Sequence, residues 1–290
     1  MRYEGSVYRP PSEAGSLILQ ITIGCAHNLC TFCGMYKGEH FRIRPISDVI
    51  EDLGWARAHY QHIEKVFLAD GDALVLQNKA LIRILDTILD LFPECQKVSI
   101  YGSPKDVLRK SADELAELRN KGLSMIYIGG ESGSDKILER IKKGVKSEEL
   151  VEAVQKIEDA DIKASVTFIS GLGGRLDWEE HAVKTGEVIS RMSPSYVGLL
   201  TLMTEPGTEL YEDILAGRFS LLSAEEVLEE TKLLLENINL EKKCVFRSNH
   251  ASNYLSLRGD LPEDKGAMLA QIEKAKRNAS MIKDERFRML

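Results

Sequence analysis

The chain has 290 residues, of which 43% are hydrophobic and 29% charged, as is usual for a globular protein that folds in water. Its net charge of −7 gives it no bulk attraction for nucleic acid, and no apolar run approaches the roughly 18–20 residues that span a bilayer. The first residues lack the apolar stretch of a secretory signal, so we expect a cytoplasmic protein with no membrane partner.

Seven short apolar runs alternate with stretches that carry helical patterns. The runs, which we expect to form strands, are Leu17–Ile23, Lys65–Ala69, Lys97–Tyr101, Ser124–Ile128, Lys163–Ile169, Ser195–Leu202 and Cys244–Arg247. Between the second and third runs, Leu81, Leu85, Ile88 and Phe92 recur on one face of a helix. Capping-box patterns begin two later helices, at Ser111 and Ser223.

Strands that alternate with helices predict a parallel sheet covered by helices. We therefore expect an α/β fold, a partial TIM-like barrel of about six to seven strands. Residues 1–240 would form the core, and residues 241–290 would add a strand and a helix that close it. In such folds the functional residues lie on the loops after the strands.

The loop after the first run holds three of the five cysteines. Cys25, Cys30 and Cys33 lie within nine residues, which favours a metal site over a disulfide framework. Three thiolates can hold three corners of a four-iron cluster and leave the fourth iron open to another ligand. Either of the remaining two, Cys95 and Cys244, can be a small buried apolar residue.

Two alternatives stay open at this loop. His27 could complete a Cys3His zinc site, although it lies only two residues after Cys25. The protein would then be a zinc or iron–sulfur binding module without catalysis. A metal-dependent barrel hydrolase fits less well, because most of the six histidines fall on helices or connecting segments rather than at strand ends.

The loop resembles that of the radical S-adenosylmethionine (SAM) superfamily. That family places Cys-x3-Cys-x2-Cys after its first strand, with an aromatic residue before the last cysteine, the place that Phe32 takes here. The first gap in this chain has four residues instead of three. The resemblance continues in the same order over roughly residues 15–205.

Two further segments carry the resemblance at the ends of the second and fourth runs. Gly71 and Asp72 correspond to a glycine-rich motif whose backbone binds the methionine amino group, and Asp72 could accept from that ammonium. Glu131 and Ser132 resemble the Glu-Ser-Gly of a branch that includes methylthiotransferases and oxygen-independent coproporphyrinogen oxidases. There the acidic residue contacts the ribose hydroxyls, and a later cation, here Lys143, holds the methionine carboxylate.

After the fifth run, Ile169, Gly171 and Leu172 resemble the family motif in which an aliphatic residue packs on adenine. Taken singly, each of these segments also fits an ordinary turn, a strand end or, for Lys143, a solvated helix end. Their order along the chain favours the family.

The resemblance implies an enzyme with two cofactors, a [4Fe–4S] cluster and SAM. Reductive cleavage of SAM would give a 5′-deoxyadenosyl radical that abstracts a hydrogen atom from substrate, as part of an oxidoreductase or transferase reaction. An electron donor such as flavodoxin or ferredoxin would be a partner. We expect a small-molecule substrate rather than nucleic acid, with modification of tRNA or a protein as the alternative.

A polar cluster follows the last apolar run. Asn249, His250 and Asn253 would lie on the same face of a parallel barrel as the cysteine loop, where they could contact substrate. An ordinary turn in which His250 is hydrogen-bonded explains the same residues equally well.

Overall fold

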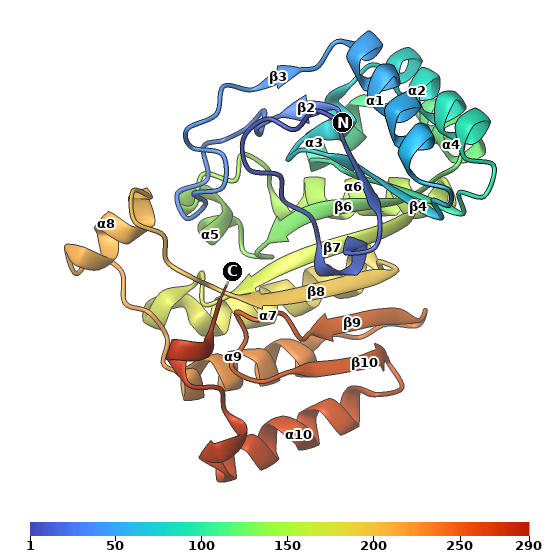
Figure 1. Ribbon diagram of the computed structural model, residues 1–290. Helices are drawn as coiled ribbons and strands as arrows, with labels where there is room; N and C mark the ends of the chain where they lie inside the picture. Colours follow the sequence, from blue (N-terminus) through green and yellow to red (C-terminus); the bar gives the residue numbers. More distant parts are fainter. Residues whose placement is uncertain (290) are drawn as a thin grey trace. The chain divides into compact units, whose positions relative to one another are not determined.

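The computed structural model describes residues 1–289. The α-helices are α1 (Ile46–His59), α2 (Asn78–Leu91), α3 (Pro104–Arg109), α4 (Ala112–Asn120), α5 (Asp135–Arg140), α6 (Ser147–Asp159), α7 (Gly174–Met192), α8 (Glu209–Leu215), α9 (Ala224–Asn237) and α10 (Lys265–Arg277) (Figure 1). The strands are β1 (Leu17–Gln20), β2 (Thr22–Ile23), β3 (Arg42–Ile43), β4 (Lys65–Ala69), β5 (Lys97–Tyr101), β6 (Leu123–Glu131), β7 (Lys163–Ser170), β8 (Tyr196–Thr201), β9 (Cys244–Ser248) and β10 (Leu257–Leu261). Four short 3-10 helices are η1 (Pro11–Glu13), η2 (Ala73–Val75), η3 (Ala279–Met281) and η4 (Glu285–Phe287).

The main sheet has eight strands in the order β1-β4-β5-β6-β7-β8-β9-β10. The pairings β1–β4, β4–β5, β5–β6, β7–β8 and β8–β9 are parallel, and β10 pairs antiparallel with β9. The order follows the chain without reversal, which is the strand order of a partial TIM-like barrel. The predicted α/β class with a mainly parallel sheet is confirmed, with eight strands instead of six to seven.

Three details of the strands differ from the prediction. The run expected as one strand, Leu17–Ile23, is interrupted at Ile21; its first part pairs with β4, and its second part forms a separate antiparallel pair with β3. The two residues of β3 are exposed, so no apolar run marked them. In β10 only the first and last residues are buried, and a glycine and an aspartate lie between them.

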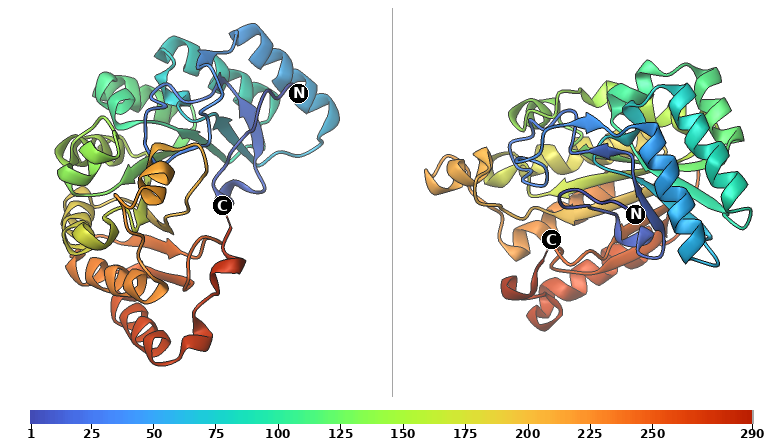
Figure 2. Two further views of the ribbon diagram at one scale, coloured as in Figure 1. Left: turned by 90° about the vertical axis from the view of Figure 1, so that its left-hand side faces the viewer. Right: turned by 45° about the horizontal axis from the view of Figure 1, so that its top comes forward.

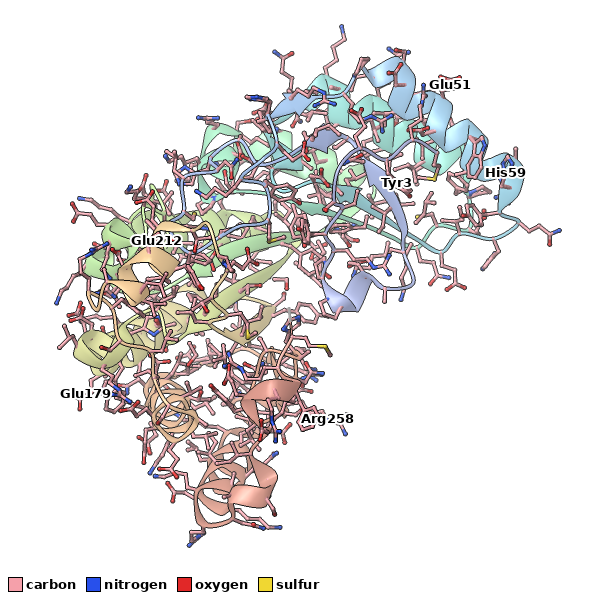
Figure 3. The ribbon with its side chains drawn as sticks, turned by 60° about the vertical axis from the view of Figure 1, so that its left-hand side comes forward. Tyr3, Glu51, His59, Glu179, Glu212 and Arg258 are labelled. Carbon is pink, nitrogen blue, oxygen red and sulfur yellow. The ribbon has the colours of Figure 1, made fainter. Side chains whose placement is uncertain are left out.

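The structure divides into two compact units, which we describe separately. Unit 1 comprises residues 1–28, 35–128 and 156–164. Its helices α1, α2 and α4 lie side by side (Figure 1) and bury the apolar faces that the sequence predicts, including Leu53 and Leu85. Glu51 and His59 lie on the exposed side of α1 (Figure 3), where the His59 ring stacks on the exposed Trp55.

Unit 2 comprises residues 29–34, 129–155 and 165–290. Helix α7 packs against α9, and α10 packs against both α9 and β10 (Figure 2). The predicted capping box at Ser223 begins α9, and the one at Ser111 begins α4 of unit 1. Across the described residues, no helix is both long enough and apolar enough to cross a membrane.

Candidate functional site

The loop that leads into the first cysteine is fixed to the end of β4 by one carboxylate. Asp70 Oδ2 accepts from Gln20 Nε2 at 2.7 Å and from the backbone N–H of Gly24 at 3.3 Å. Gly24 has a φ of +77°, a conformation that glycine adopts without steric cost. Asp70 therefore holds the turn directly before Cys25.

Gly71 lies against the first cysteine. A Cβ placed on Gly71 would lie 3.2 Å from Cys25 Cβ and 2.7 Å from Cε2 of the Tyr36 ring. The glycine-rich segment predicted after the second strand is thus next to the beginning of the cysteine loop in unit 1. Asp72, the residue after Gly71, is buried and immediately precedes η2.

In this region Tyr36 Oη and Asp70 Oδ1 are buried and have no hydrogen-bond partner among the described residues. Burial raises the pKa of Asp70 to about 6, although hydrogen bonds from Gln20 and Gly24 partly offset the effect. Burial, followed by the charge of Asp70, raises the pKa of Tyr36. Buried polar groups in native proteins are normally paired. Asp70 Oδ1 is therefore an acceptor that fits a ligand with N–H donors, such as an amino group.

The other two cysteines belong to unit 2, where their turn is attached at both sides. The backbone N–H of Thr31 donates to Ile141 O at 3.0 Å, and Leu210 N donates to Thr31 O at 2.9 Å. Cys30, Phe32 and Cys33 are half-buried. The three cysteines of the loop are therefore all partly accessible, as ligands of an inserted cluster must be.

Among residues 1–289, no three His, Cys, Asp or Glu side chains converge on a point where one ion could be held. A four-iron cluster binds its cysteines through different irons, so its thiolates need not meet at one point. A Cys3His zinc site requires that all four ligands reach a single ion. Three thiolates on one loop are a donor set that suits an iron–sulfur cluster.

At the end of β6, Glu131 and Lys143 are paired. Lys143 Nζ donates to Glu131 Oε1 at 2.8 Å, and both side chains are mostly buried. Glu131 has a φ of +63°, which is uncommon for a residue with a side chain and is often found at functional sites. The structure thus brings together two residues that the sequence assigned to different groups of one ligand.

Ser132 is buried in the turn that leads to α5, and its Oγ accepts from the backbone N–H of Ser134 at 3.1 Å. Near the end of β7, Ile169 is half-buried, whereas Leu172, which follows the strand, is fully buried in the core of unit 2. The carbonyl of Leu172 accepts from Arg140 at 2.7 Å. Ser132 and Leu172 therefore have clear local structural roles.

Glu230 and His181 lie near this turn and were not predicted from the sequence. Gly171, which has a φ of +93°, donates its N–H at 2.7 Å to the buried carboxylate of Glu230 on α9. Glu230 also contacts His181 Nδ1 at 3.0 Å. No sequence pattern indicates this contact, because the residues lie on different helices and meet only in the folded structure.

The polar cluster after β9 lies in the loop between β9 and β10. Asn253 is buried; its Oδ1 accepts from Thr201 Oγ1 at 2.9 Å, and its Nδ2 donates to Leu199 O at 2.9 Å. His250 is half-buried, with Nδ1 2.9 Å from Ser252 Oγ, and Asn249 is exposed. Burial, followed by the charge of Lys283, lowers the pKa of His250. Asn253 thus attaches the loop to β8, and a role of the three residues toward substrate stays a prediction.

Comparison with known proteins identifies one family. The model of the radical SAM superfamily matches residues 19–185, more than half of the chain. A putative methylthiotransferase of Methanocaldococcus jannaschii is 27% identical over 200 residues, which cover 67% of this chain and 43% of that protein. A tRNA-2-methylthio-N6-dimethylallyladenosine synthase of Bdellovibrio bacteriovorus is 27% identical over 55% of this chain and 36% of its own length. The chain spans less than half the length of these two relatives.

Solved structures show the same fold. The radical SAM methyltransferase TsrM of Kitasatospora setae, bound to cobalamin and a [4Fe–4S] cluster, matches 74% of this chain and 43% of its own, with a TM-score of 0.58 and 17% identity. Coproporphyrinogen III oxidase HemN of Escherichia coli matches 76% of this chain and 52% of its own, with a TM-score of 0.57 and 16% identity. At these identities the likeness concerns the fold.

Proposed function

Because the chain belongs to the radical SAM superfamily, we propose that it holds one [4Fe–4S] cluster on Cys25, Cys30 and Cys33 and cleaves SAM reductively. When bound, the cluster and SAM supply a 5′-deoxyadenosyl radical that abstracts a hydrogen atom from the substrate. The observation that carries the proposal is the loop of three partly accessible cysteines, whose first member lies against Gly71.

The residues of unit 1 are assigned to the amino end of SAM. Gly71 leaves room beside Cys25 for a close approach to the backbone, and Asp72 follows it in the same buried turn. Asp70 Oδ1 supplies a buried acceptor for an ammonium group. This adds Asp70 to the residues that the sequence suggested.

The residues of unit 2 are assigned to the ribose, the carboxylate and the adenine. A carboxylate such as Glu131 can accept from both ribose hydroxyls, and Lys143 beside it can pair with the methionine carboxylate. Ile169 and Gly171, at the end of β7, would contact adenine, with Ser132 and Leu172 supporting the turns that carry the contact residues. Phe32 would cover the cluster between the second and third cysteines.

We propose a small-molecule substrate, since the net charge of −7 gives no general attraction for nucleic acid. Asn249, His250 and Asn253 would contact it from the loop after β9. The electron would come from a flavodoxin or ferredoxin. The names of the curated relatives favour a second candidate, transfer of a methylthio group to tRNA.

Release of 5′-deoxyadenosine tests the proposal. Anaerobically reconstituted protein, reduced with dithionite and given SAM, should release 5′-deoxyadenosine and methionine in equal amounts. Cys33→Ala should release none, because one corner of the cluster loses its thiolate. Cys95→Ala, which removes a cysteine outside the loop, is the matched control and should behave like wild type. Equal release by Cys33→Ala and wild type would contradict the assignment of the cluster ligands.

A further inference from the structure

A fully buried carboxylate lies below the turn that follows β7. Glu230 on α9 has no exposed surface, and its Oε2 accepts from the backbone N–H of Gly171 at 2.7 Å and from the hydroxyl of Ser170. Moving a carboxylate out of water is costly in free energy. An apolar side chain of similar size would fill the space between the packed helices without that cost. The carboxylate therefore indicates a requirement other than packing.

The other oxygen of Glu230 meets a fully buried histidine. His181 on α7 places Nδ1 3.0 Å from Glu230 Oε1, and its Nε2 lies 3.5 Å from the backbone carbonyl oxygen of Glu131. The ring therefore lies between two oxygen atoms, one on α9 and one at the end of β6. A buried His–Glu pair thus connects α9 and α7 to the end of β6.

The pair reaches the two turns that hold the proposed nucleoside contacts. Gly171 follows β7, and Glu131 is the last residue of the neighbouring strand β6; their φ values are both positive, +93° and +63°. A backbone in this region persists for a residue with a side chain only when its surroundings fix it. Hydrogen bonds to Gly171 N–H and to Glu131 O act directly on the two peptide units concerned.

We propose that Glu230 and His181 are positioning residues for the nucleoside part of SAM. Glu230 fixes the turn at Gly171, and His181 fixes the carbonyl of Glu131, whose carboxylate then faces the ribose. The inference rests on the proposed function, because it assigns a role to residues that support the SAM contacts of unit 2. It predicts that loss of the pair weakens binding of the nucleoside end and leaves the methionine end unaffected.

Calorimetric binding of three ligands to the reconstituted enzyme separates these ends. For Glu230→Ala, which removes the acceptor for Gly171 N–H and the partner of His181, the affinities for SAM and for 5′-deoxyadenosine should each fall about tenfold, the effect of losing about 1.4 kcal/mol. The affinity for methionine should stay within twofold of wild type. The matched control is Glu94→Ala in unit 1, because the Glu94 carboxylate also accepts from a backbone N–H, that of Ile63 at 3.0 Å, and from a side chain, that of Arg57 at 2.7 Å. This control should keep all three affinities.

Substitutions of His181 give a second test that does not depend on whether Glu230→Ala folds. The amide nitrogen of Gln can reach the position of Nε2 and donate to Glu131 O, whereas that of Asn corresponds to Nδ1. His181→Asn should therefore lose more nucleoside affinity than His181→Gln. In a Glu131→Ala background, the effect of His181→Asn on nucleoside affinity should largely disappear, because the carboxylate that His181 positions is gone.

Iron content and circular dichroism show whether each variant keeps its cluster and its fold. Folded variants that bind 5′-deoxyadenosine as tightly as wild type would overturn the inference, and so would an equal loss of methionine and nucleoside affinity. Failure of the proposed function has a different signature, since the wild-type enzyme itself would then neither bind nor cleave SAM.

Discussion

Gly129 lies two residues before Glu131. Because it has no side chain, it leaves room for the Glu131–Lys143 pair. A Cβ at Gly129 would lie 2.1 Å from Glu131 Oε1 and 2.8 Å from Lys143 Nζ. Real Cβ atoms do not come that close to other heavy atoms, so a side chain here must displace both charged groups. The geometry of the proposed ribose contact thus depends on the absence of a side chain at residue 129.

Gly129→Ala should weaken SAM binding by about 1–3 kcal/mol, the cost of a lost buried hydrogen bond. Gly54→Ala is the matched control, because Gly54 lies in α1 with no heavy atom within 4 Å of its added Cβ. That substitution should keep SAM affinity and stabilise the protein by about 0.5–1 kcal/mol, since alanine favours the helix. Calorimetry and thermal unfolding measure the two effects. Unchanged SAM affinity in Gly129→Ala would remove the Glu131–Lys143 pair from the site.

Glu13 is a buried carboxylate of unit 1 that no sequence pattern indicated. Its Oε1 accepts from Lys97 Nζ at 2.6 Å and from Tyr127 Oη at 2.6 Å, and its Oε2 accepts from Ser16 Oγ at 2.5 Å. Burial raises the pKa of Glu13, but the hydrogen bonds from Lys97, Ser16 and Tyr127 outweigh it and leave the pKa below the usual 4.5. A carboxyl with a lowered pKa in the fold contributes stability above its unfolded pKa and loses it as the pH falls.

Glu13→Gln should therefore be less stable than wild type at neutral pH, and the difference should shrink as the pH falls below about 4.5. Urea unfolding of both proteins across this pH range measures the difference in their free energy of unfolding. The titration of the other carboxylates cancels in this difference, because both proteins share them. Glu179→Gln, at an exposed position on α7 (Figure 3), controls for the substitution itself. A difference between wild type and Glu13→Gln that grows on acidification would show that the bonds to Glu13 are not formed in the native state.

At the scale of elements, most strands were predictable because their apolar residues form continuous runs. The runs at β4 and β5 have the predicted bounds, and those at β6 to β9 differ at their ends by one to three residues. The missed strands, β3 and β10, are short or mostly polar, and only their pairing with a neighbour makes them strands. The division of the chain at residue 240 stays a prediction.

The same distinction applies to the site. Gly71, Glu131 and Gly171 each lie in a short segment at the end of a different strand, and each was predicted from the motif in its own segment. Asp70 lies beside Gly71, but its role depends on contacts with Gln20 and Gly24, which no spacing reveals. His181 and Glu230 depend in the same way on the packing of α7 against α9.

The loop between β9 and β10 is held rigidly in unit 2. Asn253 connects it to β8, and Arg288 donates to Ser252 O at 2.6 Å and to Leu202 O at 2.7 Å. The loop therefore has the fixed geometry that a substrate contact requires.

His250→Ala should keep its cluster and cleave SAM at the wild-type rate, but it should no longer couple that cleavage to substrate turnover. Ser256→Ala, at an exposed position in the same loop, is the matched control and should keep the wild-type coupling. The ratio of 5′-deoxyadenosine to product, measured once a substrate is identified in cell extract, gives the result. A wild-type ratio in His250→Ala would show that the loop has a structural role only.

At the scale of the whole molecule, membership of the radical SAM superfamily explains the order of the motifs along the chain. The residues proposed to bind the cofactors are divided between the two units. Unit 1 carries Cys25, Gly71 and Asp72, and unit 2 carries Cys30, Cys33, Glu131 and Lys143.

The central claim is that the three cysteines hold a cluster whose open iron binds SAM. Its most direct test is electron paramagnetic resonance of the anaerobically reconstituted, dithionite-reduced protein with and without SAM. We predict about four irons per chain and a reduced-cluster signal that shifts when SAM is added. In Cys33→Ala both the signal and the shift should be lost, while Cys95→Ala should keep them. Stoichiometric zinc without iron in anaerobically purified protein, or a cluster signal that SAM leaves unchanged, would contradict the account.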